Sequence, residues 1–540
     1  MEATRSPGKM LLNQKVVRNL KDAMEYVDDA LDVLFERADE DPSEIDRIFD
    51  NLAEDSLSTA FSGVGAAEVA TKSFYAALQK RCPSRCSGLA PTRISHQIDW
   101  DTDCQRELLA GGGDACVFGD IMQFFRPELL TTIAALKERP SLIMDVLGPA
   151  VKAGVAMKLD GACLRHGGQC VLREARRHVA GTSCTAHSKQ GGQRGLNDAT
   201  SIHLLAWMGL RRQLQEADIV QENVTSFPVS VLNHYLGDLY FIDHMKMGPE
   251  EFGWAILRDR QFVKLRHRVK IIAEISPMSR FVRRFHRLCA FTWKDFFFLH
   301  EHKDWDKAEN PIIPDEAVVE LKWAQSRRKS LAADTSVTTT ASRGAYYGAL
   351  TQVERDFDSG YEDRWPNCCR SLQQDPACHA MRSVGPYMHT MIRNLGIVWA
   401  PHVQRWLLPT EALVAMGFPT HPRNSASGHL CSYNIKLDVP RTGRHVCARA
   451  GNTMHLNVIL AVMMHSLACY DASNYAKLFD VVTAARRSAP ASSSSSLSPL
   501  APSIRPADAL QGNEAACTDT PTAIDTPHTP SRRLRRKTSV

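Results

Sequence analysis

The sequence predicts an α/β fold in which a doubly wound parallel sheet is joined to a smaller, irregular domain. From about Leu57 onward, short apolar runs and glycine-containing turns alternate with helical patterns. This alternation is typical of a parallel sheet with helices on both faces. Between about 305 and 380 the periodicity fades, and Pro, Ser, Thr and charged residues dominate. That second region is expected to form the smaller domain.

Each expected strand is a short apolar run that ends at a turn. The runs are 57–61, 94–98, 115–118, 178–180 and 217–221. A helical pattern at 202–215 separates the last two strands, and an apolar helix at 456–468 closes the ordered part. Before the first strand, apolar residues recur at helical spacing, at Val17, Leu20, Met24, Val27, Leu31 and Leu34. The segment 17–34 is therefore an amphipathic helix, packed either on the main domain or against a partner helix.

Composition limits the class of protein. The chain has 540 residues, 44% of them hydrophobic, which is enough to bury a core in two or more domains. Its net charge of +5 permits a polyanionic partner but does not require one. No apolar run approaches the ~20 residues of a membrane span, and the N-terminus lacks the apolar stretch of a secretory signal. We expect a soluble, intracellular protein with no membrane partner.

The 15 cysteines are scattered and odd in number, which fits a reducing compartment. Cys82 and Cys86 lack a second pair at zinc-binding spacing, so we expect no metal site. From about Ser488 the chain is rich in Ser, Pro and Thr and is expected to be disordered. It ends in a basic cluster at 532–537, which is either a nuclear-import or nucleic-acid patch or a solvated tail. We expect nuclear localisation.

The turn after the first strand suits a ligand. In the segment 61–68, Phe61 is followed by Gly63 and Gly65, and a helix begins there. Glycines at such a turn let the backbone approach a ligand, with helix N–H groups facing it. A tight strand-to-helix turn needs glycine in any case, so this signal is weak alone. No Lys-Ser/Thr pair follows, which argues against a nucleoside triphosphate.

Acidic residues follow the next two strands. Asp99 ends the second strand, where a carboxylate can bind ribose hydroxyls, and the adjacent Trp100 can stack on adenine. Asp120, followed by Ile121, ends the third strand, where it can accept a hydrogen bond from an exocyclic amine. Together, the three strand ends indicate an adenosine-containing cofactor.

One cysteine stands apart from the others. Cys184 lies in a glycine-flanked turn after the fourth strand, and Glu222 begins a Glu-Asn-Val at the end of the fifth. A thiol and a carboxyl brought to one pocket by neighbouring strand ends can carry out covalent catalysis on an electron-poor ring. Taken alone, a cysteine such as Cys184 is more often a small buried apolar residue than a nucleophile.

Eight segments, in order, resemble the motifs of the cytosine-5 DNA methyltransferase family, which uses S-adenosylmethionine. They are FSGVGAAE, DWDTDCQREL, GDI, AGTSCTAHSKQGGQRGLND, ENV, FGWAILRDRQFV, RWLLPTEALVAMGFP and GNTMHLNVILAV. The resemblance runs from about Leu57 to Ser466, with an unmatched stretch between. Eight motifs in the family's order are far more specific than any one of them.

The resemblance implies a Rossmann-like methyltransferase sheet and a set of residue roles. Cys184 would attack carbon 6 of cytosine, and Glu222 would hold the ring nitrogen and the exocyclic amine. Arg260, with Arg258, would orient the base and favour the thiolate. The substrate would be double-stranded DNA with the target cytosine flipped out. Cofactor contacts would come from the strand-end residues named above and from Asn452.

The resemblance also implies a domain layout. A target-recognition domain would span 270–400, and its basic and aromatic run at 280–298 would suit phosphate contact, unless it is only a solvated helix face. The full expected order is an N-terminal helical segment (1–54), a cofactor-binding catalytic domain (55–269), the recognition domain (270–400), the rest of the catalytic domain (401–482) and the tail (483–540).

The sequence departs from the family at several positions. Ser183 and Thr185 flank Cys184 where the family has Pro and Gln, and the loss of the proline is expected to loosen the loop. Ile256 replaces a glutamine, and Thr59 replaces an aspartate. In addition, a Gly-Gly pair of the first motif reads Gly65-Ala66 here. The nucleophile, the Glu and both Arg residues are retained, which favours an active enzyme.

Two alternatives stay open at this point. One is an RNA cytosine-5 methyltransferase built on the same fold. The other is a catalytically weak family member that acts as a regulatory or scaffold protein, with the helix at 17–34 recruiting a partner.

Overall fold

The computed structural model describes residues 14–36, 42–111, 113–188, 191–271, 273–300, 343–377, 380–392, 397–420 and 449–470. The chain divides into two units, Met1–Thr483 and Ala484–Val540, and all described residues belong to the first. The Ser/Pro-rich tail, its basic cluster and most of the predicted irregular region at 305–380 therefore lie outside the described residues. The domain boundaries predicted within the first unit stay predictions.

A seven-stranded sheet lies at the centre of the described unit, with the strand order β4-β3-β2-β7-β8-β10-β9. Its strands are β2 (Ser56–Ala60), β3 (Arg93–Ile98), β4 (Cys116–Phe118), β7 (Arg177–Gly181), β8 (Asp218–Val224), β9 (Tyr240–Met247) and β10 (Arg260–His267). The first five pair in parallel and coincide with the five predicted strands. The predicted Rossmann-like parallel arrangement of these strands is confirmed.

The sheet extends beyond the five predicted parallel strands and contains one antiparallel strand. β10 is antiparallel to both of its neighbours, β8 and β9. Only a short segment without a long helix separates β9 from β10, and a parallel pair would need a longer crossover. The sheet is therefore mixed, and β10 returns its first residue, Arg260, to the edge of the sheet where β8 ends.

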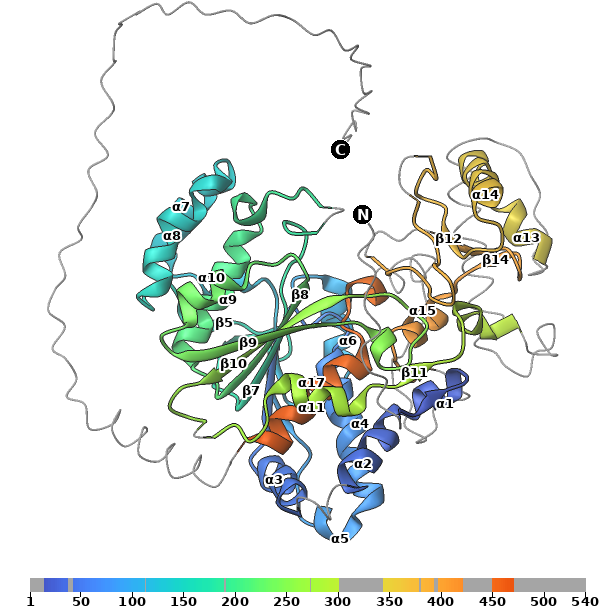
Figure 1. Ribbon diagram of the computed structural model, residues 1–540. Helices are drawn as coiled ribbons and strands as arrows, with labels where there is room; N and C mark the ends of the chain where they lie inside the picture. The colour runs from blue at the N-terminus through green and yellow to red at the C-terminus, as the bar shows by residue number, and fades with distance from the viewer. Residues whose placement is uncertain are drawn as a thin grey trace, which may run out of the picture. The chain divides into compact units, whose positions relative to one another are not determined.

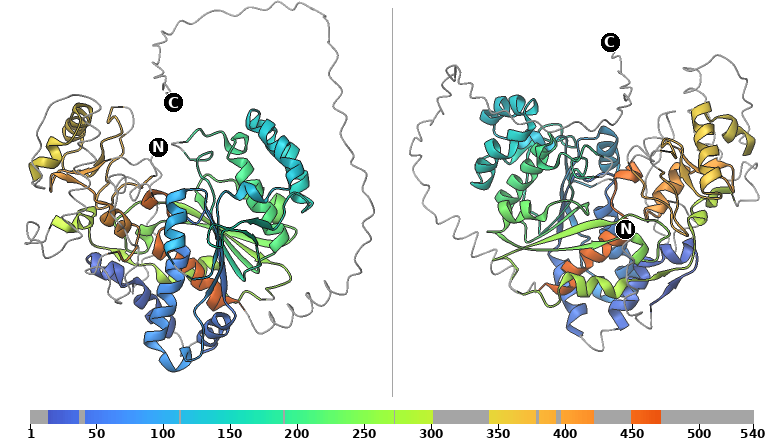
Figure 2. Two further views of the ribbon diagram at one scale, coloured as in Figure 1. Left: turned by 180° about the vertical axis from the view of Figure 1, so that it is seen from behind. Right: turned by 45° about the horizontal axis from the view of Figure 1, so that its top comes forward.

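Helices cover both faces of the sheet (Figures 1 and 2). One face carries helices from both ends of the described chain, namely α2 (Tyr26–Glu36), α3 (Pro42–Ala53), α4 (Ala66–Arg81) and α17 (Leu456–Cys469). The other carries α7 (Pro127–Lys137), α8 (Ile143–Lys152), α9 (Ser201–Leu214) and α10 (Val229–Leu236). Each layer encloses its own apolar core, which confirms the doubly wound prediction.

Shorter elements complete the described part. The helices are α1 (Leu20–Met24), α5 (Pro83–Cys86), α6 (Thr102–Ala110), α11 (Met278–Val282), α13 (Arg343–Gly348), α14 (Gln352–Arg364) and α15 (Pro409–Ala415). The small sheets are β1 (Val16–Val17) with β11 (Leu288–Cys289), β5 (Asp160–Ala162) with β6 (Gln169–Val171), and β12 (Arg370–Ser371), β13 (Val398–Ala400) and β14 (Arg405–Trp406). Among the described residues, no helix is both long and apolar enough to span a membrane.

The predicted helix at 17–34 forms as two helices with a break at Glu25. Asn19 starts α1 by accepting a hydrogen bond from the Asp22 backbone N–H at 2.9 Å. Leu20, Leu31 and Leu34 are buried in the core beside α4 and α17. Of the two interpretations of this apolar stripe, packing on the parent domain is confirmed, because the stripe already lies within the core of its own chain.

The basic and aromatic run at 280–298 is partly interior, so only part of it stays available for the predicted phosphate contact. Its aromatic residues are buried. Arg284 makes two hydrogen bonds to Glu44 of α3, at 2.7 and 3.0 Å, and Arg287 pairs with Asp29 of α2 at 2.6 Å. Carboxylates of the N-terminal helices thus pair with Arg284 and Arg287. The other two arginines of the run, Arg280 and Arg283, are exposed.

Because the Arg287–Asp29 pair is buried, we predict that Asp29→Asn lowers the free energy of unfolding by about 3 kcal/mol, since it leaves a guanidinium without its counter-charge. The matched control is Asp32→Asn on the same helix, where the pair with Arg81 is exposed and contributes under about 1 kcal/mol. Urea denaturation of the two variants measures the difference. Equal losses would contradict a structural role for the buried pair.

Candidate active site

The loop that carries Cys184 is fixed at the ends of two adjacent strands. Gly181, the last residue of β7, is in register with Glu222 of β8. Thr182 follows, and its hydroxyl accepts hydrogen bonds from Gln221 Nε2 at 2.6 Å and from Asn223 Nδ2 at 2.9 Å. Asn223 Nδ2 also contacts the Thr182 carbonyl at 3.1 Å. The side chains on either side of Glu222 therefore anchor the start of the nucleophile loop.

Beyond this anchor the chain turns at Cys184 without the proline that the family has. The Cys184 carbonyl accepts hydrogen bonds from the backbone N–H groups of His187 at 3.0 Å and Ser188 at 2.8 Å. Among the cysteines that the structure describes, Cys184 alone is exposed. Backbone hydrogen bonds thus form the turn, and Cys184 lies at the surface of the described part, although protein surrounds much of its thiol.

Glu222 and Arg260 form an ion pair beside the loop. The Arg260 Nε atom lies 3.1 Å from Glu222 Oε1, and both side chains are largely buried. They meet because β10 runs antiparallel to β8 and places its first residue opposite Val224. The pair fixes a carboxylate at the strand end, where it can accept hydrogen bonds from a base.

The charges around Cys184 act in opposite directions. The surrounding protein raises the pKa of the Cys184 thiol, and the Glu222 carboxylate raises it further, whereas Arg260 and Arg258 lower it. The net effect is a pKa above the ordinary value, so the thiol form dominates at neutral pH. The nucleophile must therefore lose its proton as the substrate binds or reacts.

Arg258 has a different position from the one its motif implied. It is buried, and its guanidinium donates to three backbone carbonyls, Met391 at 2.8 Å, Gly451 at 3.2 Å and Thr453 at 2.8 Å. Burial and then the charge of Arg260 lower its pKa to about 9. Arg258 is therefore a positioning residue that ties the segment 449–454 to the start of β10, while Arg260 is the arginine at Glu222.

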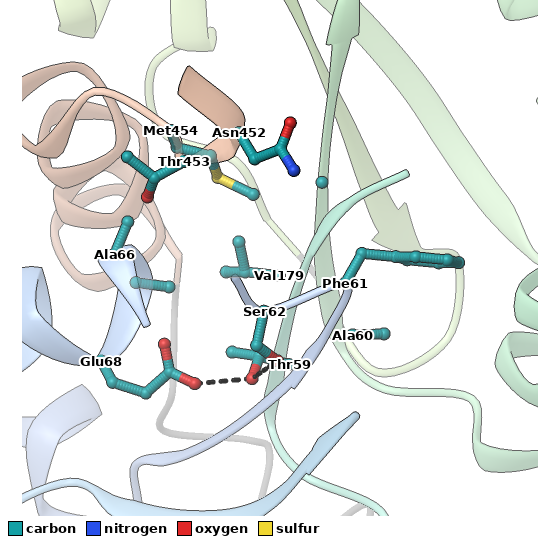
Figure 3. A pocket seen from close by; sticks show the side chains of 12 residues that line it. Thr59, Ala60, Phe61, Ser62, Ala66, Glu68, Val179, Asn452, Thr453 and Met454 are labelled. Atoms are coloured by element: carbon teal, nitrogen blue, oxygen red, sulfur yellow. Dashed lines mark hydrogen bonds between the residues drawn. The ribbon is translucent and has the colours of Figure 1, made fainter. Parts of the chain in front are cut away.

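A pocket lies next to this site, at the end of β2. It is lined by the end of β2 and the turn after it, by the first turn of α4, by Val179 and Gly181 of β7, and by the segment 452–454 (Figure 3). Phe61 and Asn452 come from opposite ends of the sequence and both line it, as predicted for cofactor-binding residues. Phe61 has a φ of +52°, an uncommon conformation for a bulky residue.

The glycine turn and the second strand end are joined at Asp99. Gly63 and Gly65 have φ values of +55° and +78°, in the left-handed region that favours glycine. The Gly63 backbone N–H donates to Asp99 Oδ2 at 2.7 Å, and the Asp101 N–H donates to Asp99 Oδ1 at 2.9 Å. Trp100 beside it is 58% exposed, so its indole is accessible for stacking.

The two residues predicted at the end of the third strand, Asp120 and Ile121, have different surroundings. Asp120 precedes a short 3-10 helix (Ile121–Phe124) and accepts a hydrogen bond from the Met122 N–H at 2.9 Å. The Asp120 side chain is half exposed, with His203 Nε2 4.0 Å away. Ile121 is buried in the apolar core under α9. The carboxylate is thus accessible to a ligand, whereas the Ile121 side chain belongs to the core.

Sequence reasoning missed Glu68, the last residue of the first motif. Its carboxylate is buried beside the pocket, and Oε1 accepts hydrogen bonds from Thr59 Oγ1 at 2.6 Å and Gln97 Nε2 at 2.7 Å. Oε2 is buried and has no hydrogen-bond partner among the residues that the structure describes. Thr59 stands where the resembled motif has an aspartate, and Glu68 of α4 places a carboxylate within hydrogen-bond distance of it. The missed signal was an acid three residues into a helix that begins at a glycine turn.

These residues fit S-adenosylmethionine, which carries a positive ammonium group. A buried carboxylate oxygen that lacks a donor favours a cationic ligand group. Glu68 would hold the ammonium end, while Asp99, Trp100 and Asp120 stand where ribose and adenine contacts were predicted. Glu68 lines the pocket, whereas Asp99, Trp100 and Asp120 are not among its lining residues, so the observed fit is at the ammonium end.

No model of a known protein family matches the chain, and no curated protein matches it. Three solved structures are similar to it, each over 76% of its length. They are an E. coli prophage protein assigned as a DNA modification methyltransferase (13% identity, 98% of that chain, TM-score 0.40), S. pombe Dnmt2 methyltransferase (12%, 97%, 0.35) and the Entamoeba histolytica methyltransferase EhMeth (11%, 97%, 0.37). All three are methyltransferases by name. At such low identities and TM-scores, the function of this chain is inferred from its own motifs and side-chain geometry.

Because Glu222 and Arg260 act on Cys184 with opposite signs, we predict opposite shifts in its reactivity. Glu222→Gln removes a charge that raises the pKa of the thiol, so alkylation by iodoacetamide at pH 8 becomes several-fold faster. Arg260→Gln removes a charge that lowers the pKa, so alkylation becomes slower. Mass spectrometry of the Cys184 peptide across pH 6 to 10 measures both profiles. Arg266→Gln, on the same strand and paired with Glu274, serves as the control. Shifts in the same direction for both variants would contradict the electrostatic account.

Proposed function

We propose that this protein is a DNA cytosine-5 methyltransferase that uses S-adenosylmethionine and forms a covalent adduct through Cys184. One observation carries the proposal. The exposed Cys184 is held at the end of β7, beside the Glu222–Arg260 pair and next to the pocket that Phe61 and Asn452 line.

The chemistry requires a nucleophile and an acid–base partner on one cytosine. Carbon 5 of cytosine is a poor nucleophile until another group adds to carbon 6. The Cys184 sulfur, as thiolate, forms a bond to carbon 6, while Glu222 binds the ring nitrogen and the exocyclic amine and stabilises the charge that develops. Arg260 holds the Glu222 carboxylate in place and favours the thiolate.

The remaining steps restore the enzyme. Bound S-adenosylmethionine would supply the methyl group to carbon 5, with its sulfur–methyl bond breaking and S-adenosylhomocysteine leaving. The proton on carbon 5 then leaves to water, the bond between carbon 6 and the sulfur breaks, and Cys184 is released as thiolate. Because the thiol form dominates in the free protein, turnover is expected to increase as pH rises.

DNA is the proposed substrate because the motifs resemble the DNA-methylating family. A target cytosine inside a duplex must be flipped out before a thiol can reach it. Arg280 and Arg283, which are exposed, are available for phosphate contact. The basic cluster at 532–537 supports a nuclear location and adds a further nucleic-acid contact.

We predict that the purified protein transfers labelled methyl groups from S-adenosylmethionine to duplex DNA and that Cys184→Ser abolishes the transfer. Cys82→Ser, at a cysteine remote from β7, is the control and should retain activity. Duplex DNA that carries 5-fluorocytosine should trap a covalent complex with the wild type and not with Cys184→Ser. Transfer to RNA alone would establish the RNA alternative, and cofactor binding without transfer to either would establish the scaffold alternative.

A second prediction concerns the cofactor. If Glu68 holds the ammonium group, Glu68→Gln should weaken S-adenosylmethionine binding about tenfold or more, since a charge-assisted hydrogen bond is lost. Affinity for 5′-methylthioadenosine, which lacks the amino-acid part, should change little. Calorimetric titration of both ligands measures the two values. An equal loss for both would show that the substitution disturbs the whole pocket and would contradict the assigned contact.

A further inference from the structure

A second cluster of reactive side chains lies away from the candidate active site. Three thiols and one imidazole approach one another there, with all four possible ligand atoms within 4.8 Å of one another. The residues are Cys116, Cys163, His166 and Cys170, and we call them the Cys3His cluster. The sequence analysis gave no role to any of them.

Two segments far apart in sequence build the cluster. Cys116 is the first residue of the edge strand β4. The other three residues lie in and beside the loop between β5 and β6 (β5 is labelled in Figure 1). Gly167, with a φ of +68°, reverses the chain in that loop, and the Cys163 N–H donates to the Gly168 carbonyl at 2.8 Å. The hairpin thus presents Cys163, His166 and Cys170 to the edge of the sheet.

The distances within the cluster match tetrahedral zinc coordination. The His166 Nδ1 atom lies 3.4 Å from the Cys163 sulfur, 3.4 Å from the Cys170 sulfur and 3.6 Å from the Cys116 sulfur. Zinc bonds of about 2.3 Å to sulfur and about 2.0 Å to nitrogen, at the tetrahedral angle, place nitrogen and sulfur about 3.5 Å apart. The three sulfurs and the nitrogen therefore surround a point that could bind a metal ion.

The donor set selects the metal. Three thiolates and one imidazole favour zinc over the hard cations, which prefer oxygen. Four protein ligands leave no open position, so such a site is structural rather than catalytic. None of the three cysteines forms a disulfide.

The two strands of the hairpin are mostly exposed, which makes a metal link useful. β5 and β6 have three residues each, and four of these six side chains are exposed. A two-stranded hairpin of this length is marginally stable on its own. Its existing ties to the sheet edge are few, chiefly the Leu164 N–H to the Val117 carbonyl at 2.7 Å and Arg165 Nε to the Ala115 carbonyl at 2.8 Å.

We propose that the Cys3His cluster binds one structural zinc ion, which fastens the β5–β6 hairpin to the edge strand β4. Each cysteine binds as thiolate and releases its proton, and neutral His166 binds through Nδ1. The hairpin also holds the turn after β4, because the Ala162 N–H donates to Gln123 at 2.8 Å and the Lys158 N–H donates to the Phe124 carbonyl at 2.8 Å. The zinc ion therefore stiffens the segment that follows Asp120.

The first test is metal content. Full-length protein purified without chelators should contain about one zinc per chain by elemental analysis. His166→Ala and Cys170→Ser should lose that zinc. Cys82→Ser, at a half-buried cysteine outside the cluster, should keep it. Less than a tenth of an equivalent of zinc in the wild type, one equivalent of iron in its place, or full zinc in His166→Ala would overturn the proposal.

The second test reports the ligand set and stays informative if a variant folds poorly. Cobalt(II) exchanged into the wild type should give the intense visible bands of a tetrahedral site together with thiolate charge-transfer absorption. In His166→Cys, which keeps four ligands, the cobalt should remain bound with stronger charge-transfer absorption. Octahedral cobalt spectra, or a disulfide between two of the three cysteines in freshly purified protein, would contradict the site.

The third test reports the structural role. Removal of zinc by a chelator should speed hydrogen exchange in the peptide that covers 158–172 by tenfold or more, while exchange at β7 and β8 is unchanged. Exchange at 158–172 that does not respond to zinc removal would overturn the stapling role. All three readouts are independent of methyl transfer, so they stand or fall separately from the proposed activity.

Discussion

The candidate site depends on the parallel pairing of β7 and β8. Because Gly181 is in register with Glu222, a thiol three residues beyond Gly181 and a carboxylate on β8 lie at the same edge of the sheet. A slip of one residue would turn Glu222 to the other face of the sheet. Gln221 and Asn223 hold Thr182 from both sides of Glu222, so the same short strand sets the register and anchors the loop. The relative position of Cys184 and Glu222 is therefore fixed by backbone pairing before any ligand binds.

A second constraint joins the two halves of the site across the sequence. The segment 452–454 lines the pocket, yet 195 residues separate its Thr453 from Arg258. Arg258 links the two segments by donating hydrogen bonds to three backbone carbonyls. Because Arg258 is buried, water cannot replace these bonds without a cost in free energy. Two arginines two positions apart thus have separate roles: Arg258 positions the cofactor side, and Arg260 positions Glu222. Their shared motif gave no means of telling them apart, because the difference lies in which partners the fold brings to each.

What the sequence could predict was local. Each of the five parallel strands is a short apolar run that ends at a turn, and these signals lie within a few residues of one another. The motif residues at the strand ends followed from the same logic. The antiparallel direction of β10 and the burial of Arg287 against Asp29 were not predictable in this way, since both depend on partners far away in the chain. The unpartnered oxygen of Glu68 is also a property of the assembled pocket, because Thr59 and Gln97 occupy only the other oxygen of the carboxylate.

The Cys3His cluster was not predictable from the sequence for the same reason, because its ligands come from separate segments. Cysteine spacing alone gave no indication of a zinc site, because Cys82 and Cys86 have no second pair. The three ligands of the β5–β6 hairpin form an irregular Cys-x2-His-x3-Cys pattern, and the fourth is supplied by a different strand. Only the pairing of β4 with β3 at one edge of the sheet, and the hairpin's contact with β4, bring them together.

A small hairpin that cannot bury its own side chains gains more from four bonds to one ion than from any substitution on its surface. It also lies against the turn that carries Asp120, so the two ends of β4 have different surroundings: its first residue belongs to the Cys3His cluster, and the turn after its last residue carries the half-exposed Asp120 carboxylate.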